Sequence, residues 1–277
     1  MSISNIMGRT AILAAVLWSG GIGAASGSLL YTSVQAPYQV NVPGLGYQAT
    51  STTEFGDLVH FTGTDRSLSS ITVLMSNWAK YSDWSASYGL AGYAVPITMS
   101  LYNVLNPLSG PSVGSLIASR TITPTIVWRP EPNPTCGSGF LGWDNRCYSG
   151  LAQAIVFDFT GVWVPDDVIY GLSFNTENYG PTPTGVAGPY NSLNVGLVTT
   201  PPIVGTDLDP NVVFWNTAHA GFLTSGIAGV FGPDSAWAPY SPAISIEAIP
   251  EPASLALFGM AALGLLTGHR ACRRRQA

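Results

Sequence analysis

Apolar and polar positions alternate over short stretches in the middle of the chain. Within residues 70–78, Ile71, Val73 and Met75 would face one side of a strand and the residues between them the other, which is the period of a β-strand. No stretch of this middle region keeps a helical period for three turns. Runs rich in β-branched and aromatic residues, bounded by Gly, Pro, Asn and Ser, cover residues 58–62, 70–78, 95–104, 115–122, 126–129, 152–159, 168–175, 192–198, 212–216 and 243–248.

This pattern predicts an all-β fold. The 31 glycines and 21 prolines break the chain too often for βα units. We therefore predict a single antiparallel two-sheet sandwich of jelly-roll type, with an up-and-down barrel as the alternative. Two irregular segments, residues 129–150 and 179–190, are expected to be loops at the rim of the sandwich, where binding surfaces are often found.

The pattern changes at the C-terminal end. The chain there runs from Pro250, Glu251 and Pro252 through an uncharged stretch, residues 253–268, to Arg270, Arg273, Arg274 and Arg275. As a helix, residues 252–269 would span about 27 Å, close to the hydrocarbon core of a bilayer. Arginines beside a short apolar span stay in the cytoplasm, so the preceding chain is expected outside. A buried C-terminal helix of a soluble domain and a permanent anchor without processing are the alternatives.

The N-terminal end has the pattern of a secretory signal peptide. Arg9 supplies positive charge, residues 11–18 form an apolar core, and Gly23, Ala24 and Ala25 provide a small-residue cleavage site. A first transmembrane helix is the alternative, but this apolar core is too short to cross a bilayer. The chain is therefore divided into a signal peptide, a passenger domain and a C-terminal signal, at residues 1–25, 26–249 and 250–277.

The three C-terminal features, in their order, resemble the PEP-CTERM sorting signal of bacterial proteins. The resemblance covers residues 249–277 and rests on the tripeptide, the apolar span and the arginine cluster together. It implies a C-terminal helix that holds the chain in the inner membrane, and a processing membrane protease, exosortase, as a partner. After cleavage near Pro250, the passenger would be at the cell surface or extracellular.

Setting the two signals aside makes the passenger strongly acidic. The chain has 10 Lys plus Arg and 15 Asp plus Glu, a net charge of −5. Five basic residues and one acid, Glu251, lie in the signals, which leaves the passenger five basic and fourteen acidic residues and a net charge of −9. This balance argues against nucleic acid as a partner, because phosphate binding needs a basic patch. It is compatible with solubility, with cation binding and with a neutral glycan such as an exopolysaccharide.

The three cysteines divide between the segments. Cys136 and Cys147 lie in the exported passenger, where an oxidising compartment permits a disulfide, and we predict that they pair. Cys272 lies in the arginine-rich tail. No further Cys or His accompanies the pair at ligand spacing, so a zinc site is not expected.

Tryptophans supply the candidates for a ligand-binding face. Trp84, Trp143 and Trp237 fall in predicted loops, where exposed indole rings would stack on sugars. The other tryptophans of the passenger lie in or beside predicted strands and are expected in the core; they are Trp78, Trp128, Trp163 and Trp215.

Carboxylates give less specific signals. Asp207 and Asp209 alternate in a predicted loop and are the candidates for a structural calcium site, with Asx-turns as the alternative. We expect no cofactor other than this ion. A polysaccharide hydrolase would need two acids facing each other across a cleft, and Asp158, Glu177 and Asp207 are the acids considered for that role.

The two histidines of the passenger indicate no catalytic site. His60 lies in an apolar strand and is expected to be structural, and His219 lies in a predicted loop. No Gly-x-Ser-x-Gly motif accompanies them, so we assign no catalytic residue.

Five motifs of the passenger, taken in order, resemble a family of secreted bacterial β-sandwich proteins without an established activity. They occupy residues 53–57, 128–147, 164–171, 188–195 and 205–216. The resemblance implies the fold and no catalytic residue. We therefore expect an exported, non-enzymatic protein with a structural or adhesive role at the cell surface or in the extracellular matrix. A secreted glycan-binding module and a polysaccharide hydrolase are the alternatives.

Overall fold

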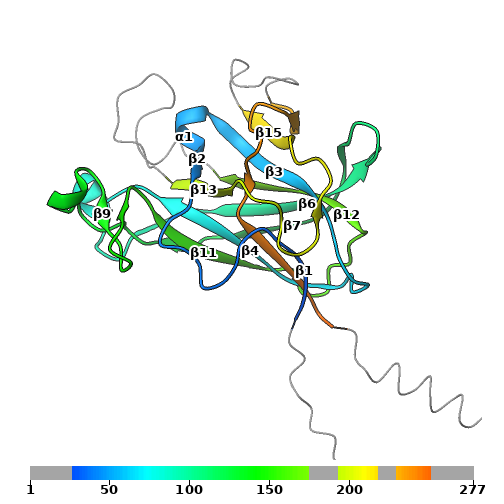
Figure 1. The fold of residues 1–277 in the computed structure, drawn as a ribbon, viewed down its shortest axis with the longest axis horizontal. Coiled ribbons are helices and arrows are strands. Elements are labelled where there is room, and N and C mark those ends of the chain that lie inside the picture. The colour runs from blue at the N-terminus through cyan, green and yellow to red at the C-terminus, as the bar shows by residue number, and fades with distance from the viewer. Residues whose placement is uncertain (1–26, 175–192, 218–228, 251–277) are drawn as a thin grey trace, which may run out of the picture.

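Two antiparallel sheets form the body of the protein in a computed structural model, which describes residues 27–174, 193–217 and 229–250 (Figure 1). This confirms the predicted all-β, two-sheet architecture. The predicted signal helix and C-terminal transmembrane helix, in residues 1–25 and 253–268, lie outside the described residues. Of the helices in the described ranges, none is long and apolar enough to cross a membrane.

The first sheet has seven strands. They are β1 (Ser28–Thr32), β2 (Gly44–Gly46), β4 (Leu68–Asn77), β11 (Leu151–Asp158), β13 (Leu193–Val198), β17 (Ser241–Pro242) and β18 (Ile244–Ala248). The order is β1–β18–β4–β13–β17, with β11 paired to β4 and β2 paired to β13. β4 is the centre of this sheet, because it pairs along one edge with the whole length of β11 and on its other edge with both β18 and β13.

The second sheet also has seven strands. They are β3 (Thr52–His60), β6 (Ile97–Leu105), β7 (Ser112–Ile122), β12 (Asp167–Phe174), β14 (Thr206–Asp207), β15 (Val213–Thr217) and β16 (Gly232–Asp234). The order is β16–β15–β3–β12–β6–β7, and β14 pairs with the end of β3 that β15 leaves open.

Short elements decorate the sandwich. They are α1 (Tyr47–Thr50), α2 (Tyr81–Trp84), the 3₁₀ helix η1 (Pro134–Cys136), and the strand pairs β5 (Tyr93–Ala94) with β8 (Thr125–Ile126) and β9 (Phe140–Leu141) with β10 (Cys147–Tyr148).

The chain winds between two rows of four strands, β1–β18–β4–β11 in one sheet and β3–β12–β6–β7 in the other. Taken in sequence, these strands alternate between the rows at every step except the β6–β7 hairpin, and the first pairs with the last. Strands β13 to β17 lie between β12 and β18 in the sequence and widen both sheets.

The core lies between the sheets. Ile71, Val73 and Met75 of β4 point into it, as their alternation predicts, and each is at most 1% exposed. Leu74 points the other way and is buried against Val42 on the outer face of the first sheet. Because burying one such side chain contributes about 1.5–3 kcal/mol, the long alternating strands account for most of the drive to form the sandwich.

Every apolar run of the sequence overlaps a strand, although residues 126–129 supply only the end of β8. The longest of the described strands missed from the sequence is β1, a five-residue segment that closely follows the predicted signal peptide. It forms because β18 offers it an open edge: Ser28 lies opposite Ala248 and Thr32 opposite Ser245.

Candidate functional site

The point where the chain leaves the sandwich is the first candidate site. β18 is an interior strand between β1 and β4, and its pairing with β1 brings both described chain ends to one corner (Figure 1). After β18, the Ile249 N–H donates to the Ser67 carbonyl over 2.8 Å. Pro250, the first residue of the predicted sorting motif, follows at once. Glu251, Pro252 and the arginine cluster Arg270, Arg273, Arg274 and Arg275 lie outside the described residues.

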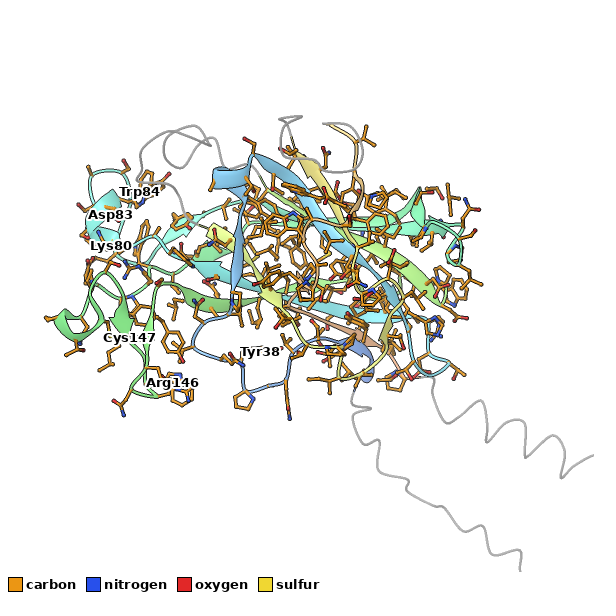
Figure 2. All side chains as sticks on the ribbon, turned by 45° about the horizontal axis from the view of Figure 1, so that its top comes forward. Tyr38, Lys80, Asp83, Trp84, Arg146 and Cys147 are labelled. Atoms are coloured by element: carbon orange, nitrogen blue, oxygen red, sulfur yellow. A yellow bond between two sulfur atoms is a disulfide. The ribbon has the colours of Figure 1, made fainter. Side chains whose placement is uncertain are left out.

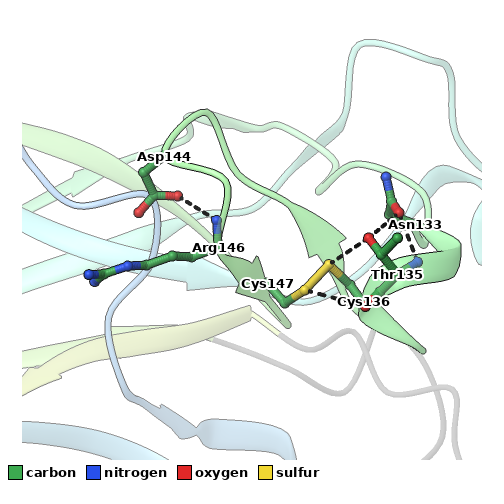
Figure 3. The surroundings of a disulfide bond; sticks show 6 residues. All are labelled: Asn133, Thr135, Cys136, Asp144, Arg146 and Cys147. Atoms are coloured by element: carbon green, nitrogen blue, oxygen red, sulfur yellow. Dashed lines mark hydrogen bonds between the residues drawn. A yellow bond between two sulfur atoms is a disulfide. The ribbon is translucent and has the colours of Figure 1, made fainter.

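A disulfide organises the second candidate site. Cys136 and Cys147 are bonded, with their Cα atoms 5.3 Å apart, which confirms the predicted pair (Figure 3). The loop that they close contains the small hairpin of β9 and β10. Its turns are held locally, because Asn133 Oδ1 accepts the Thr135 N–H over 3.0 Å and Asp144 Oδ1 accepts the Arg146 N–H over 3.2 Å. We call residues 133–148 the stapled loop.

A buried arginine attaches the stapled loop to the sandwich. Arg129 is 8% exposed and donates to the carbonyls of Trp78, Pro130 and Ser138 over 2.8, 3.0 and 3.0 Å. Since a charged side chain buried in this way needs several acceptors, replacing Arg129 would release the base of the loop. Sequence reasoning missed this residue, whose only signal was a lone arginine beside a tryptophan and a proline.

The three candidate tryptophans do not form one exposed face. Trp143 is 80% exposed on the stapled loop. Trp84, in α2, is partly buried and packs edge-on against Tyr88, with ring centres 6.2 Å apart (Figure 2). Trp237 packs edge-on against Trp215 at 5.4 Å, so it contributes to the core. Only Trp143 keeps the exposure that the ligand-face prediction requires.

Two of the four tryptophans expected in the core are exposed instead, so that expectation is wrong for them. Trp215 is buried, and Trp128 packs against the core. Trp78 is 43% exposed and lies over Gly150, where a Cβ would meet its ring at 2.3 Å. Trp163 is 68% exposed, because the next residue in the chain is the one that enters the core.

The calcium candidates are part of a turn. Asp207 Oδ1 accepts the Asp209 N–H over 2.9 Å, which is the Asx-turn considered as the alternative. Across the described ranges, no group of three His, Cys, Asp or Glu side chains is placed to hold a metal ion. In this part of the chain, no third carboxylate or imidazole joins Asp207 and Asp209 as a possible calcium ligand.

Asp57 forms an acidic centre inside the sandwich that the sequence reasoning overlooked. It lies on the same face of β3 as Phe55 and Val59, both core residues, and it is 0% exposed. Tyr170 of β12 lies directly opposite Asp57, and Asp207 of β14 lies opposite Val59, so all three side chains share this inner face.

The hydrogen bonding of Asp57 is incomplete among the described residues. Its Oδ1 accepts the Leu58 N–H over 2.9 Å, whereas its Oδ2 and the hydroxyls of Tyr31 and Tyr170 are buried without a partner there. Burial, and then the nearby charge of Asp207, hold the pKa of Asp57 well above its ordinary value. Burial also raises the pKa of Asp207. These shifts favour the neutral, protonated acid inside the sandwich.

A hollow of about 440 Å³ lies at the end of β3, between the 62–66 turn and β14. His60 lines it, and its Nδ1 is 2.6 Å from Asp167 Oδ1. Beside it, Arg66 Nε donates to Asp166 Oδ1 over 2.8 Å. Both acids are thus paired with basic side chains, and Asp158 accepts the Thr160 N–H over 2.8 Å in an Asx-turn. His219 and Glu177 lie outside the described residues.

A second hollow, of about 400 Å³, opens beside the 33–39 loop on the outer face of the first sheet. Tyr38 and Gln39 contribute to its lining together with Leu74 (Figure 2). Burial, and then the charge of Glu247, raise the pKa of Tyr38. Hydroxyl, amide and apolar groups line this hollow.

Comparison with known proteins adds one finding to this geometry. The sequence model of the PEP-CTERM protein-sorting motif matches residues 248–275. Neither a curated protein nor a solved structure matches the chain. The resemblance of the passenger to a secreted β-sandwich family therefore stays a prediction. Residues 248–275 of this chain carry a PEP-CTERM sorting motif, which implies export, processing by exosortase and sorting to the cell envelope or surface.

Proposed function

We propose that this chain is a non-enzymatic structural or adhesive protein whose jelly-roll passenger is displayed at the cell surface or in the extracellular matrix. The strand order supports the jelly roll. The observation that carries the proposal is the single exit corner: β1 and β18 lie side by side, and Ile249 alone separates β18 from the sorting motif. The passenger is therefore attached to the sorting motif at one corner, and the stapled loop lies away from that corner (Figure 1).

The bonding of the acids supports a non-catalytic passenger. Asp166 and Asp167 are paired with basic side chains, and Asp158 and Asp207 close Asx-turns. A glycoside hydrolase needs two carboxyl groups about 5–9.5 Å apart with a sugar bond between them. Carboxyl groups that already accept hydrogen bonds in turns or form ion pairs are not free to act as the acid and the nucleophile or base of glycoside hydrolysis. Release of reducing ends from a polysaccharide by the purified chain would refute this part of the proposal.

The chain offers its own control for a test of export and processing. An epitope placed after Gly27 should appear at the cell surface or in the medium of a host that has exosortase. Replacing Pro250 and Pro252 by Ala should leave an uncleaved chain in the membrane fraction. The same replacement in the other Pro-Glu-Pro, residues 130–132, should leave processing unchanged. An epitope found in the cytoplasm, on a chain with its leader uncut, would refute the export route.

A structural or adhesive role predicts an effect on the cells themselves. Cells that process the chain should sediment as aggregates or hold more matrix than cells that carry the Pro250 and Pro252 replacements. The two strains would make equal amounts of passenger and differ only in its release. Equal aggregation and equal matrix in both strains would contradict the role.

A glycan-binding function is the second candidate, and one observation favours it. Trp143 is 80% exposed on a loop that a disulfide and the Arg129 contacts hold in place. A rigid, exposed indole loses little entropy when it stacks on a sugar ring. Trp143→Ala should abolish retention of the chain on exopolysaccharide, while Leu108→Ala, at a loop position that is 92% exposed, should leave it unchanged. Equal retention of both variants would remove this candidate.

A further inference from the structure

Three large apolar side chains are exposed around the exit corner. Trp163 is 68% exposed, Ile249 is 39% exposed and Leu29 is 37% exposed. Trp163 was expected in the core, so its exposure at the surface needs an explanation. Single exposed apolar residues are ordinary on protein surfaces, but a group of them beside one chain exit marks a surface that meets an apolar partner.

Backbone pairing places the three residues in one row along the end of the first sheet. Leu29 of β1 lies opposite Glu247 of β18. The Ile249 N–H then bonds the Ser67 carbonyl, just before β4, and Ser67 forms an isolated bridge with Trp163.

The side chains next to this row in sequence fill the core. They are Leu30, Val164 and Ala248, each 0% exposed. Since neighbours along a strand point to opposite faces, the alternation sends Leu29 and Trp163 outward. The exposure of this row is therefore a consequence of how the core is filled. We call Leu29, Trp163 and Ile249 the exit row.

The segment between Ile249 and the uncharged run, which we call the tether, is short enough to keep the exit row close to the membrane. The uncharged run begins at Ala253, four residues after Ile249. Even a fully extended chain of four residues reaches at most about 14 Å. The polar layer on each side of a bilayer is about 5–7 Å thick, so Ile249 lies within roughly 9 Å of its outer surface whenever residues 253–268 are inserted. A sandwich held so closely has to present its exit corner to the lipid.

We propose that the exit row is a docking surface for the outer face of the lipid bilayer, on which the passenger rests before it is released. This rests on the proposed function, because it needs the C-terminal segment in the membrane. Tryptophan favours the bilayer interface, where its ring is apolar and its N–H stays hydrated. Glu247 lies within the row and the passenger is acidic, so the contact is apolar and needs no anionic lipid. Tethering makes a contact of low intrinsic affinity effective.

Full-length chain in phosphatidylcholine vesicles tests the proposal. A small fluorophore on Thr160→Cys, in the loop that leads to Trp163, reports the distance of the corner from lipid that carries a headgroup quencher. The matched probe is Leu108→Cys, in the β6–β7 hairpin loop. Cys272→Ser leaves no other free thiol, because Cys136 and Cys147 are bonded. We expect quenching several-fold greater at position 160 than at position 108.

A second variant separates docking from anchoring. Trp163→Ser should lower the quenching at position 160, although the short tether still keeps it above the level at position 108, while the chain still floats with the vesicles. Unchanged quenching at position 160 in this variant would overturn the docking surface. Because Trp163 is mostly exposed, this change leaves the core intact. Equal quenching at the two probes in a chain that floats would overturn the docking surface and leave the proposed function standing. A chain that does not float would overturn both.

Discussion

Replacing Asp57 by Asn should flatten the pH dependence of folding. Asp57 is 0% exposed on the inner face of β3, opposite Tyr170. Burial, followed by the charge of Asp207, holds its pKa well above the ordinary value. In the unfolded chain the same carboxyl group ionises with a pKa near 3.9. Above that pH, folding has to take up a proton at Asp57.

The size of the effect follows from proton linkage. A group whose pKa is raised by folding contributes stability below its unfolded pKa and loses it as the pH rises toward its folded pKa. Each pH unit in this window costs about 1.4 kcal/mol per proton. Between pH 4 and pH 7 the loss reaches about 4 kcal/mol if Asp57 remains protonated in the folded domain throughout. Asp57→Asn removes this contribution, because an amide does not titrate.

Other carboxyl groups also change the free energy of unfolding with pH, each in a direction that follows from its own pKa shift. Burial raises the pKa of Glu54 and of Asp207, so the variant keeps part of the decline with pH. Hydrogen bonds from Thr160 lower the pKa of Asp158, which therefore loses its contribution only as the pH falls below about 4. The difference between wild type and Asp57→Asn in the window above pH 4 is thus the titration of one proton.

Urea unfolding at half-unit steps from pH 4.0 to pH 7.5, followed by tryptophan fluorescence with the disulfide intact, measures this difference. The free energy of unfolding of the wild type should fall more steeply than that of Asp57→Asn, by up to about 1.4 kcal/mol per pH unit. Asp158→Asn is the control, since its exposed carboxyl group should leave the slope unchanged. Parallel curves for wild type and Asp57→Asn would show that Asp57 is ionised in the folded domain and would refute the reasoning.

Three further predictions concern stability and are checked by thermal unfolding. Trp237→Ala should lower the free energy of unfolding by about 3 kcal/mol, because the ring packs in the core. Trp143→Ala should change it by less than about 0.5 kcal/mol, because that ring is exposed. Equal effects of the two substitutions would contradict the burial assigned to the two rings. Cys136→Ser should cost about 3 kcal/mol, as expected for a cross-link of sequence separation 11, and a reductant should then have no further effect. Gly56→Ala should destabilise by about 3 kcal/mol or more, since its Cβ would lie 1.7 Å from a carbonyl oxygen of β12, while Gly232→Ala, with nothing within 4 Å, should have little effect.

The strands were largely readable because a half-buried strand imposes its period on the residues. Ile71, Val73 and Met75 alternate in the sequence as they do in the core. Asp57 was missed although the same rule placed it, since it stands two residues from both Phe55 and Val59 on a face that faces the core. A signal was therefore present, and the expectation that acids lie at the surface concealed it.

Tryptophan exposure was the least predictable property. Trp163 was expected in the core and is exposed, whereas Trp237 was expected to be exposed and packs against the core. The sequence position of a tryptophan does not show which distant segment covers its ring. Trp237 is covered by Trp215, which precedes it by more than twenty residues. Trp163 is left uncovered because the core at that corner is already filled from β1, β4 and β18.

Local patterns were sufficient for the PEP-CTERM sorting motif, the all-β class and the disulfide, because each depends on residues close together in the chain or on composition. The meeting of β1 with β18, the buried Asp57 and the exit row depend instead on segments far apart in sequence, such as Ser28 and Ala248. Their pairing is selected by the packing of the whole core, in which strands compete for the same edges. That competition is resolved only when all the strands are present, and it places the sorting motif directly beside the folded sandwich.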